Sequence, residues 1–375
     1  MTRRRPAAPV LAALAALAVL LAACTGPDAG NVATAPTSPS SASQSSASSS
    51  TAAPATSAQA GSSTPTTSPS PAASATADAV RFSVLGDIGS SDASAAVLRS
   101  IAGRHDDFSL AVGDLSYGRN GAEDRWCRFV TRRVGARYPF ELVSGNHESD
   151  GENGDIDRFT RCLPNRLPGL VGTYGRQWYA DRPAEHPLVR VVMISPALDF
   201  GDGTWSYDEG TPRHSWLRAA VSGARAAGIP WVVVGMHKPC LSLGRYVCDP
   251  GADVVDLLLE TGVDLVVTGH EHLYQRTRPL ALGPGCPGIR PGRFTAACVA
   301  RDGEGTTFVT VGTGGHELRV VNGSDSERRY FAASSGRNEE PSFGSLDVEV
   351  TADRLGARFV PVDGGTFTDQ VVLTH

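Results

Sequence analysis

Residues 80–89 read VRFSVLGDIG and residues 108–117 read FSLAVGDLSY, and the pattern that they share decides the fold. In both segments a short apolar run is followed at once by Gly-Asp. Apolar runs of about four to eight residues that are rich in β-branched side chains predict buried strands. Similar runs recur along the chain, at residues 139–143, 188–194, 229–234, 264–267 and 307–311.

Segments with helical periodicity lie between several of these runs, at residues 94–102, 123–134, 214–226 and 254–259. Strands that alternate with helices predict an α/β fold, in which mixed β-sheets are layered and flanked by helices. After Gly344 the pattern changes to strands separated by short turns, at residues 346–350, 357–362 and 367–373. These last strands predict an antiparallel edge that closes the domain.

Polar side chains directly follow five of the predicted strands. In open α/β sheets, ligands bind beyond the carboxyl ends of the strands, where the loops converge. A glycine before the polar residue would let the backbone turn sharply toward a bound ion. We expect the following side chains to meet at this edge: Asp87, Asp114, Tyr117, Asn146, His147, Glu148, His237, His270, Glu271 and His272.

Seven of these side chains carry donors that suit metal ions: Asp87, Asp114, Tyr117, Asn146, His237, His270 and His272. Carboxylate, phenol, amide and imidazole donors fit zinc, iron or manganese, whereas copper(I) prefers sulfur. Seven donors suffice for two ions if one carboxylate bridges them. A separation of about 3.5–4 Å between two such ions is the one used for in-line phosphoryl displacement.

The ordered motifs resemble those of the calcineurin-like metallophosphoesterase superfamily, and in detail those of its purple acid phosphatase branch. That branch has GDxG, GDxxY, GNH(D/E), VxxH and GHxH. This chain has GDIG at 86–89, GDLSY at 113–117, GNHE at 145–148, VGMH at 234–237 and GHEH at 269–272. The resemblance covers most of residues 80–320. It implies a four-layer sandwich of sheets and helices, and a phosphoric ester hydrolase.

The resemblance also assigns the donors to two ions. The first ion would take Asp87, Tyr117 and His272, Asp114 would bridge, and the second would take Asn146, His237 and His270. Most of the superfamily has a histidine ligand two residues after the first aspartate, where this chain has Gly89. Tyr117 replaces that donor, and a phenolate favours ferric iron. The expected pair is therefore iron with zinc, manganese or a second iron.

The mechanism that the resemblance implies is hydrolytic, with a metal-bound hydroxide attacking phosphorus in line. His147 would steady a phosphate oxygen or protonate the leaving group. Glu148 and Glu271 are expected to orient histidines. His316 follows the strand predicted at residues 307–311, and we expect it beside the site.

One departure from the family leaves the substrate open. Plant and animal members have further histidines downstream of VxxH, but KPCLSLGRYVC at 238–248 has none. Lys238 or Arg245 would contact substrate phosphate or, alternatively, would be solvated loop cations. The leading hypothesis is a phosphomonoesterase. The alternatives are a phosphodiesterase acting on nucleotides, lipid head groups or wall polymers, and a lipoprotein that binds metal or phosphate without turnover.

The first part of the chain differs in composition from the rest. Residues 1–23 combine three early arginines with a short apolar run, which is typical of a cleaved signal peptide. LAAC at 21–24 resembles the bacterial lipobox, so Cys24 would be lipidated; an ordinary signal peptide is the alternative. Residues 25–79 are rich in Ser, Thr, Ala and Pro and predict a disordered linker. The lipid would then anchor the predicted phosphoesterase domain, residues 80–375, to the outer face of the cell membrane of a Gram-positive bacterium.

Six cysteines remain once Cys24 is set aside: Cys127, Cys162, Cys240, Cys248, Cys286 and Cys298. An even number in an exported protein favours disulfides over thiol chemistry. Six cysteines allow fifteen pairings, and the sequence does not choose among them. We prefer the pairing of nearest neighbours along the chain.

The charge balance limits the range of partners. The net charge is −5, from 34 Lys and Arg against 39 Asp and Glu. Such a balance gives no general attraction for nucleic acid, and no nucleic-acid-binding module is evident. The expected partners are a phosphate ester and, through the N-terminal lipid, a membrane. The oligomeric state is not indicated.

Overall fold

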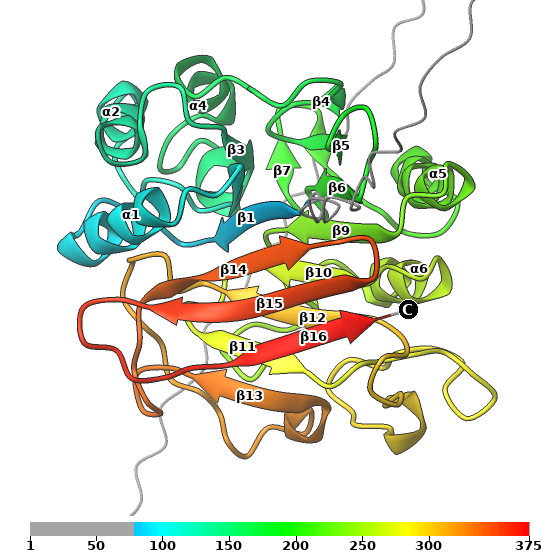
Figure 1. The fold of residues 1–375 in the computed structure, drawn as a ribbon. Helices are drawn as coiled ribbons and strands as arrows, with labels where there is room; N and C mark the ends of the chain where they lie inside the picture. The colour runs from blue at the N-terminus through cyan, green and yellow to red at the C-terminus, as the bar shows by residue number, and fades with distance from the viewer. Residues whose placement is uncertain (1–78, 375) are drawn as a thin grey trace, which may run out of the picture. The chain divides into compact units, whose positions relative to one another are not determined.

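The computed structural model describes residues 79–374, which form a mixed α/β structure (Figure 1). The predicted signal peptide, the lipidation site Cys24 and all of the predicted linker except Ala79 lie outside the described residues. Of the helices within residues 79–374, none has the length and apolar character needed to cross a membrane.

The helices are short and lie mainly between strands. The α-helices are α1 (Asp92–Arg104), α2 (Glu123–Val134), α3 (Asn146–Ser149), α4 (Ile156–Cys162), α5 (Pro212–Ala226) and α6 (Ala252–Glu260), and the 3-10 helices are η1 (Ala296–Cys298) and η2 (Arg328–Tyr330). Helix α1 begins with a capping box, in which the Ser91 hydroxyl accepts from the backbone N–H of Ser94.

The first sheet has six strands in the order β16-β15-β14-β1-β2-β3. Its strands are β1 (Val80–Leu85), β2 (Phe108–Val112), β3 (Phe140–Val143), β14 (Gly344–Val350), β15 (Arg354–Pro361) and β16 (Gln370–Thr374). Strands β1, β2 and β3 run parallel, whereas β14, β15 and β16 are antiparallel to their neighbours. The antiparallel edge predicted after Gly344 is confirmed.

The second sheet has eight strands in the order β13-β11-β12-β10-β9-β6-β5-β4, and β7 and β8 form a separate small hairpin. The strands are β4 (Val171–Thr173), β5 (Gln177–Arg182), β6 (Val189–Ile194), β7 (Asp199–Phe200), β8 (Gly203–Thr204), β9 (Trp231–Met236), β10 (Leu265–Thr268), β11 (Tyr274–Thr277), β12 (Thr307–Val311) and β13 (Phe331–Ser335). Strands β6, β9, β10 and β12 form its parallel centre.

The two sheets pack face to face around one apolar core. Phe82 of β1 and Trp231 of β9 belong to this inner core, while the adjacent Val232 faces the other way into a second core under the helices. Helices α1, α2 and α4 cover the first sheet, and α5 and α6 cover the second (Figure 1). Because the central strands are buried on both faces, they are apolar at nearly every position. The expected layered sheets flanked by helices are confirmed.

Differences from the prediction concern strand ends and the sheet edges. Strand β9 begins at Trp231 and not at Ile229, because Pro230 has no N–H to donate to a ladder. Strands β5, β11 and β13 were not predicted, since their sequences mix polar and apolar residues.

Three disulfides join neighbouring cysteines along the chain, which is the preferred pairing. Cys127–Cys162 links α2 to α4. Cys240–Cys248 closes the loop that follows β9, and Cys286–Cys298 closes the long loop between β11 and β12. Each disulfide therefore constrains an irregular or peripheral part of the domain.

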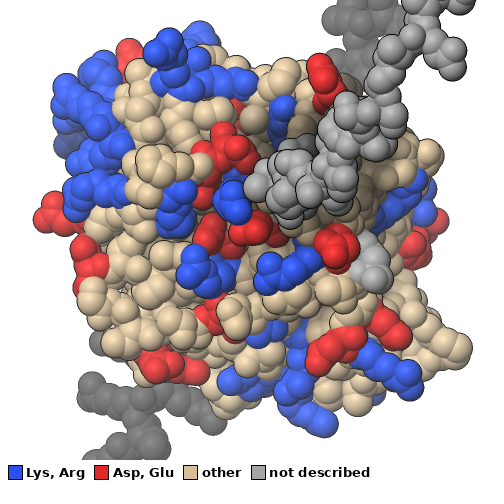
Figure 2. All heavy atoms as spheres, viewed as in Figure 1, with Lys and Arg blue, Asp and Glu red and all other residues tan. Residues whose placement is uncertain are grey.

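Charge is unevenly spread over the surface. Figure 2 shows Lys and Arg side chains gathered at the upper left, over α1 and α2. These helices contribute the exposed Arg99, Arg125, Arg128 and Arg132. The net negative charge of the chain therefore does not describe the field on this face.

Candidate active site

The residues expected at the strand ends meet at one edge of the molecule, where the parallel strands of both sheets finish. Asp87 follows β1, Asp114 and Tyr117 follow β2, and Asn146 begins α3 just after β3. His237 follows β9, and His270 and His272 follow β10. We call these seven residues the donor cluster. Five separate strand ends supply it, so its geometry depends on the register of both sheets.

The first half of the donor cluster surrounds the hydroxyl oxygen of Tyr117. This oxygen lies 3.0 Å from Oδ1 of Asp87 and 3.1 Å from Oδ2 of Asp114. It also lies 3.0 Å from Nε2 of His272, which is itself 3.4 Å from Oδ1 of Asp87.

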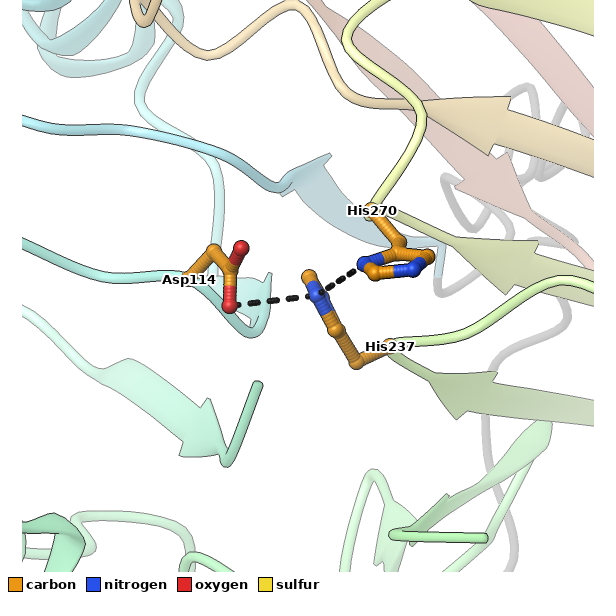
Figure 3. Close-up of side chains that lie close together, drawn as sticks. All are labelled: Asp114, His237 and His270. Atoms are coloured by element: carbon orange, nitrogen blue, oxygen red, sulfur yellow. Dashed lines mark hydrogen bonds and ion pairs between the residues drawn. The ribbon is translucent and has the colours of Figure 1, made fainter. Parts of the chain in front are cut away.

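The second half surrounds Nε2 of His237. This nitrogen lies 3.1 Å from Oδ1 of Asp114 and 3.2 Å from Oδ1 of Asn146. It also lies 3.2 Å from Nδ1 of His270, so that the His237 ring lies between Asp114 and His270 (Figure 3).

Asp114 is shared by the two halves through its two carboxylate oxygens. Oδ2 faces Tyr117 and Oδ1 faces His237. Two groups of potential metal-holding side chains contain this aspartate: Asp87 with Asp114 and His272, and Asp114 with His237 and His270. Asp114 therefore has the position required of a bridging carboxylate.

The spacing of the donors fits two metal ions. Two donors that are each about 2.1 Å from one ion, at tetrahedral or octahedral angles, lie about 3.0–3.4 Å apart. The separations in both halves fall in this range, from 3.0 to 3.4 Å. Hydrogen bonding alone explains the second half less well, because one imidazole nitrogen carries at most one hydrogen and His237 Nε2 has three close neighbours.

Backbone carbonyl groups fix the orientation of two of the histidines. Nδ1 of His237 donates to the carbonyl oxygen of Val112 at 2.9 Å, and Nδ1 of His272 donates to that of Glu317 at 2.9 Å. With the hydrogen on Nδ1, each Nε2 would present its lone pair to a cation at the centre of the cluster. Against the effect of burial, the charge of Asp114 raises the pKa of His237 to about 9, so a bound cation would displace a proton from its Nε2. Both histidines are thus prepared as metal ligands.

Glu148 and Glu271 do not orient histidines, contrary to our expectation. The buried carboxylate of Glu148 accepts from the backbone N–H groups of Gly145 and Leu115. That of Glu271 accepts from the hydroxyl of Ser242 and from a backbone N–H of the Cys240–Cys248 loop. Both glutamates hold the loops that carry the site, because buried N–H groups need partners.

The sharp turn expected at the glycines occurs mainly one residue later. Asp87, Asp114 and His270 themselves have positive φ values of 56°, 51° and 69°. The glycines are required chiefly by close packing: a Cβ on Gly145 would lie 2.2 Å from Oδ1 of Asp114. Only Gly113, among the glycines that directly precede these motifs, combines a positive φ of 86° with such crowding. Strained backbone at several adjacent positions is typical of functional sites.

Burial shifts the ionisation of the donor cluster strongly. Burial raises the pKa of Asp87 to about 7, against the opposing effect of His237. It lowers the pKa of His270 to about 2 and, together with the charge of Arg319, the pKa of His272 to about 3. Neutral imidazoles have free lone pairs, and buried carboxylates need a counter-charge. Cations at this position would supply that counter-charge.

Two further histidines lie beside the cluster. Nε2 of His147 is 3.6 Å from Oδ2 of Asp114, and its Nδ1 contacts the side-chain amide oxygen of Asn153. The ring of His316 stacks on that of Tyr117, with 3.7 Å between the ring centroids. Both residues lie where we expected them, at the site but outside the donor cluster.

Two residues at the site were not predicted. The ring of Tyr246 stacks on that of His270, with centroids 3.9 Å apart, and the guanidinium of Arg319 lies 5.1 Å from the centroid of Tyr246. We call Tyr246, His316 and Arg319 the rim. Of the two loop cations named from the sequence, Lys238 forms an ion pair with Asp249 at 3.0 Å, and the guanidinium of Arg245 lies 5.6 Å from the centroid of the Tyr246 ring. The sequence signals for the Tyr246 loop were the proximity of Cys240 and Cys248 to the VGMH motif and the neighbouring Arg245.

The family described as calcineurin-like phosphoesterase matches residues 80–274, more than half of the chain. The curated relatives include purple acid phosphatase 18 of Arabidopsis thaliana, which is 26% identical over 281 residues that cover 72% of this chain and 57% of the relative. They also include a phosphoenolpyruvate phosphatase of Allium cepa, 27% identical over 72% of this chain and 55% of the relative. The chain thus spans about half the length of these relatives.

The fold is also found among solved structures. The purple acid phosphatase PPD1 from yellow lupin (Lupinus luteus) seeds is similar with a TM-score of 0.58 and 16% sequence identity. The similarity covers 80% of this chain and 54% of the lupin chain. At this identity the likeness supports the arrangement of sheets and helices.

Proposed function

Because this chain belongs to the calcineurin-like phosphoesterase family, we propose that it is a dinuclear metal-dependent phosphomonoesterase. The observation that carries the proposal is the position of Asp114, whose two carboxylate oxygens face two separate groups of donors. Asp87, Tyr117 and His272 would hold one ion with it, and Asn146, His237 and His270 the other. The relatives named as acid or phosphoenolpyruvate phosphatases support monoesters as substrates.

The metal pair, when bound, would activate a water molecule at neutral pH and neutralise charge on the phosphate oxygens. The chain itself supplies position and protons. His147 is half-buried and lies next to Asp114, and its Nδ1 is held by Asn153. Because the amide oxygen of Asn153 accepts from Nδ1, Nε2 carries a hydrogen only in the imidazolium form, and in that form it would donate to a phosphate oxygen or protonate the leaving group.

Iron is the metal that we propose for the site of Tyr117. Burial, followed by the charges of Asp87 and Asp114, raises the pKa of Tyr117 well above its usual value. Without a cation the phenol therefore stays protonated at neutral pH, and a ferric ion would displace that proton. The metal-loaded protein should then be coloured, and Tyr117→Phe should remove the visible absorption. A colourless, iron-free and active enzyme would rule out iron but not the hydrolase.

Turnover on two model substrates tests the proposed reaction. The metal-loaded full chain should hydrolyse 4-nitrophenyl phosphate with a higher kcat/KM than bis(4-nitrophenyl) phosphate. A reversed preference would favour the phosphodiesterase alternative. Retained metal with no hydrolysis of either ester would favour a binding protein and would contradict the proposed activity.

We also propose that the protein is anchored outside the cell membrane through a lipid on Cys24, as the LAAC motif indicates. Metabolic labelling with a fatty acid, followed by membrane fractionation, tests this proposal. The wild-type chain should carry the label and sediment with membranes, whereas Cys24→Ser should do neither. A labelled Cys24→Ser chain would contradict the assignment of the lipidation site.

A further inference from the structure

Arg319 has a fixed backbone position beside the donor cluster. Its backbone N–H donates to the carbonyl oxygen of His272 at 2.8 Å, and its own carbonyl oxygen accepts from the N–H of Arg337 at 2.7 Å. The residue is therefore tied directly to the segment that carries His270 and His272. Arg319 lies outside the five motifs named above and is not a member of the donor cluster.

The guanidinium of Arg319 lies beside the donor cluster with most of its hydrogen-bonding capacity unused. Within residues 79–374 its side chain makes one hydrogen bond, from Nη1 to the carbonyl oxygen of His270 at 3.3 Å. No carboxylate in that part of the chain forms an ion pair with it, although Arg81, Arg276 and other arginines are paired in this way. A guanidinium has five N–H donors, so Arg319 retains donors for a ligand.

Aromatic packing defines where the guanidinium sits. The ring of Tyr246 stacks on that of His270, and the guanidinium groups of Arg319 and Arg245 lie 5.1 Å and 5.6 Å from its centroid. The backbone N–H of Tyr246 donates to the buried Glu271, and the Cys240–Cys248 disulfide closes the loop around it. The Tyr246 ring thus places the guanidinium of Arg319 near His270, and the attraction between the guanidinium and the ring stabilises that position.

We propose that Arg319 binds the third terminal oxygen of a phosphomonoester and thereby makes the site selective for monoesters over diesters. Tyr246 is the positioning residue for its guanidinium. This inference rests on the proposed function and adds the residues that select its substrate class.

The selectivity follows from the charge and shape of the two ester classes. A phosphomonoester carries about −1.5 to −2 charges at neutral pH and has three terminal oxygens. A diester carries one charge and has two non-bridging oxygens, which two metal ions would already engage. A planar guanidinium recognises phosphate oxygens through charge-assisted hydrogen bonds, so a free one adds binding energy for the monoester only.

The test compares Arg319→Ala with wild type in the metal-loaded full chain. Calorimetry measures the affinity for orthophosphate and for dimethyl phosphate, and kinetics measure kcat/KM for 4-nitrophenyl phosphate and its bis-ester. We expect Arg319→Ala to lower orthophosphate affinity and monoester kcat/KM by about 10–100-fold. The values for dimethyl phosphate and the bis-ester should fall by less than about threefold, as expected for the loss of a screened charge.

Two further variants separate a specific contact from a general loss. Arg337→Ala removes an exposed arginine next to Arg319 in space. It should leave unchanged the ratio of orthophosphate to dimethyl phosphate affinity and the ratio of monoester to diester kcat/KM. Arg319→Lys keeps the charge without the planar fork and should recover part of the monoester binding. Metal content and the thermal midpoint should match wild type in all three variants, which excludes misfolding as the cause.

The outcomes distinguish this inference from the proposed function. Equal losses for monoester and diester ligands, or no loss for either, would overturn the role of Arg319. If the wild-type chain hydrolyses neither ester but binds orthophosphate, the hydrolase proposal fails. The ratio of orthophosphate to dimethyl phosphate affinity in Arg319→Ala then still decides whether Arg319 selects the dianion.

Discussion

The donor cluster and the rim lie within a few ångströms of each other, but different forces hold them in place. The donor cluster follows directly from strands whose register is set by parallel ladders, such as β1 with β2 and β9 with β10. The rim comes from irregular segments held by a disulfide and individual hydrogen bonds: the Cys240–Cys248 loop for Tyr246, and the stretch after β12 for His316 and Arg319.

This difference separates the chemistry of the site from its selectivity. Moving a donor requires a change in sheet register, which would turn every side chain of a strand to the other face. Moving a rim residue requires only a new loop conformation. We therefore expect changes in the donor cluster to abolish metal binding and turnover, and changes in the rim to alter which ester is used.

The largest effect should come from the shared aspartate. Asp114→Asn removes the bridging charge, so kcat/KM should fall by about 10³-fold or more and the second ion should be lost. The matched control is Asp107→Asn at the other end of β2, where the carboxylate accepts from the backbone N–H of Arg81. That variant should keep both ions and near wild-type turnover. Two retained ions in Asp114→Asn would contradict the bridging role.

Of the disulfides Cys127–Cys162 and Cys240–Cys248, the first should matter more for stability and the second more for activity. Replacing both cysteines of Cys127–Cys162, which are 35 residues apart, should cost about 4 kcal/mol of unfolding free energy with little change in turnover. Replacing those of Cys240–Cys248, 8 residues apart, should cost about 2.5 kcal/mol. Since this loop holds Tyr246, monoester turnover should drop by about tenfold. Denaturant unfolding and steady-state kinetics give both quantities, and equal turnover in the two variants would contradict the role of the rim.

A smaller effect is expected from the crowded glycines. Gly145→Ala would place a methyl group 2.2 Å from Asp114 Oδ1, so we expect a loss of about 2–3 kcal/mol in stability together with weaker metal binding. Gly103→Ala near the end of α1 meets nothing within 4 Å. It should stabilise the protein by about 0.5 kcal/mol. Normal metal content in Gly145→Ala would contradict this expectation, because the loops that carry Gly145 and Asp114 could then move apart without losing the ions.

The smallest effect should be a pH dependence that metals do not change. Burial raises the pKa of Glu141 on β3 to about 7, above its unfolded value of 4.5. The folded state then holds this proton more tightly, so stability is highest below pH 4.5 and declines as pH rises toward 7. Glu141→Gln should remove about 1–3 kcal/mol of that decline, in metal-free and metal-loaded protein alike. Thermal midpoints between pH 4.5 and 8 would show no difference if Glu141 titrates normally.

The sequence predicted the parallel centre of each sheet because both faces of those strands are buried. Residues 80–85, 108–112 and 307–311 are strands with the predicted bounds. Strand β11 was missed because its sequence, YQRT, carries polar residues that the fold satisfies internally. Gln275, for example, accepts from the N–H of Leu243 and donates to Thr310. Only the tertiary structure shows that such a polar residue is buried.

The donor cluster was predictable for the same reason that makes it rigid. Each donor follows an apolar run by only a few residues, so the local sequence predicts that it lies at a strand end. Arg319 and Tyr246 carry no such signal, because a disulfide and packing on His270 bring them to the site. The histidine-orienting carbonyls of Val112 and Glu317 were also hidden, since backbone groups have no sequence signature.

Anomalous diffraction from crystals of the metal-loaded protein tests the shared aspartate most directly. We predict two peaks about 3.5–4 Å apart, one beside Oδ1 of Asp114 with His237 and the other beside Oδ2 with Tyr117. A single peak, or two peaks of which only one contacts Asp114, would contradict the account.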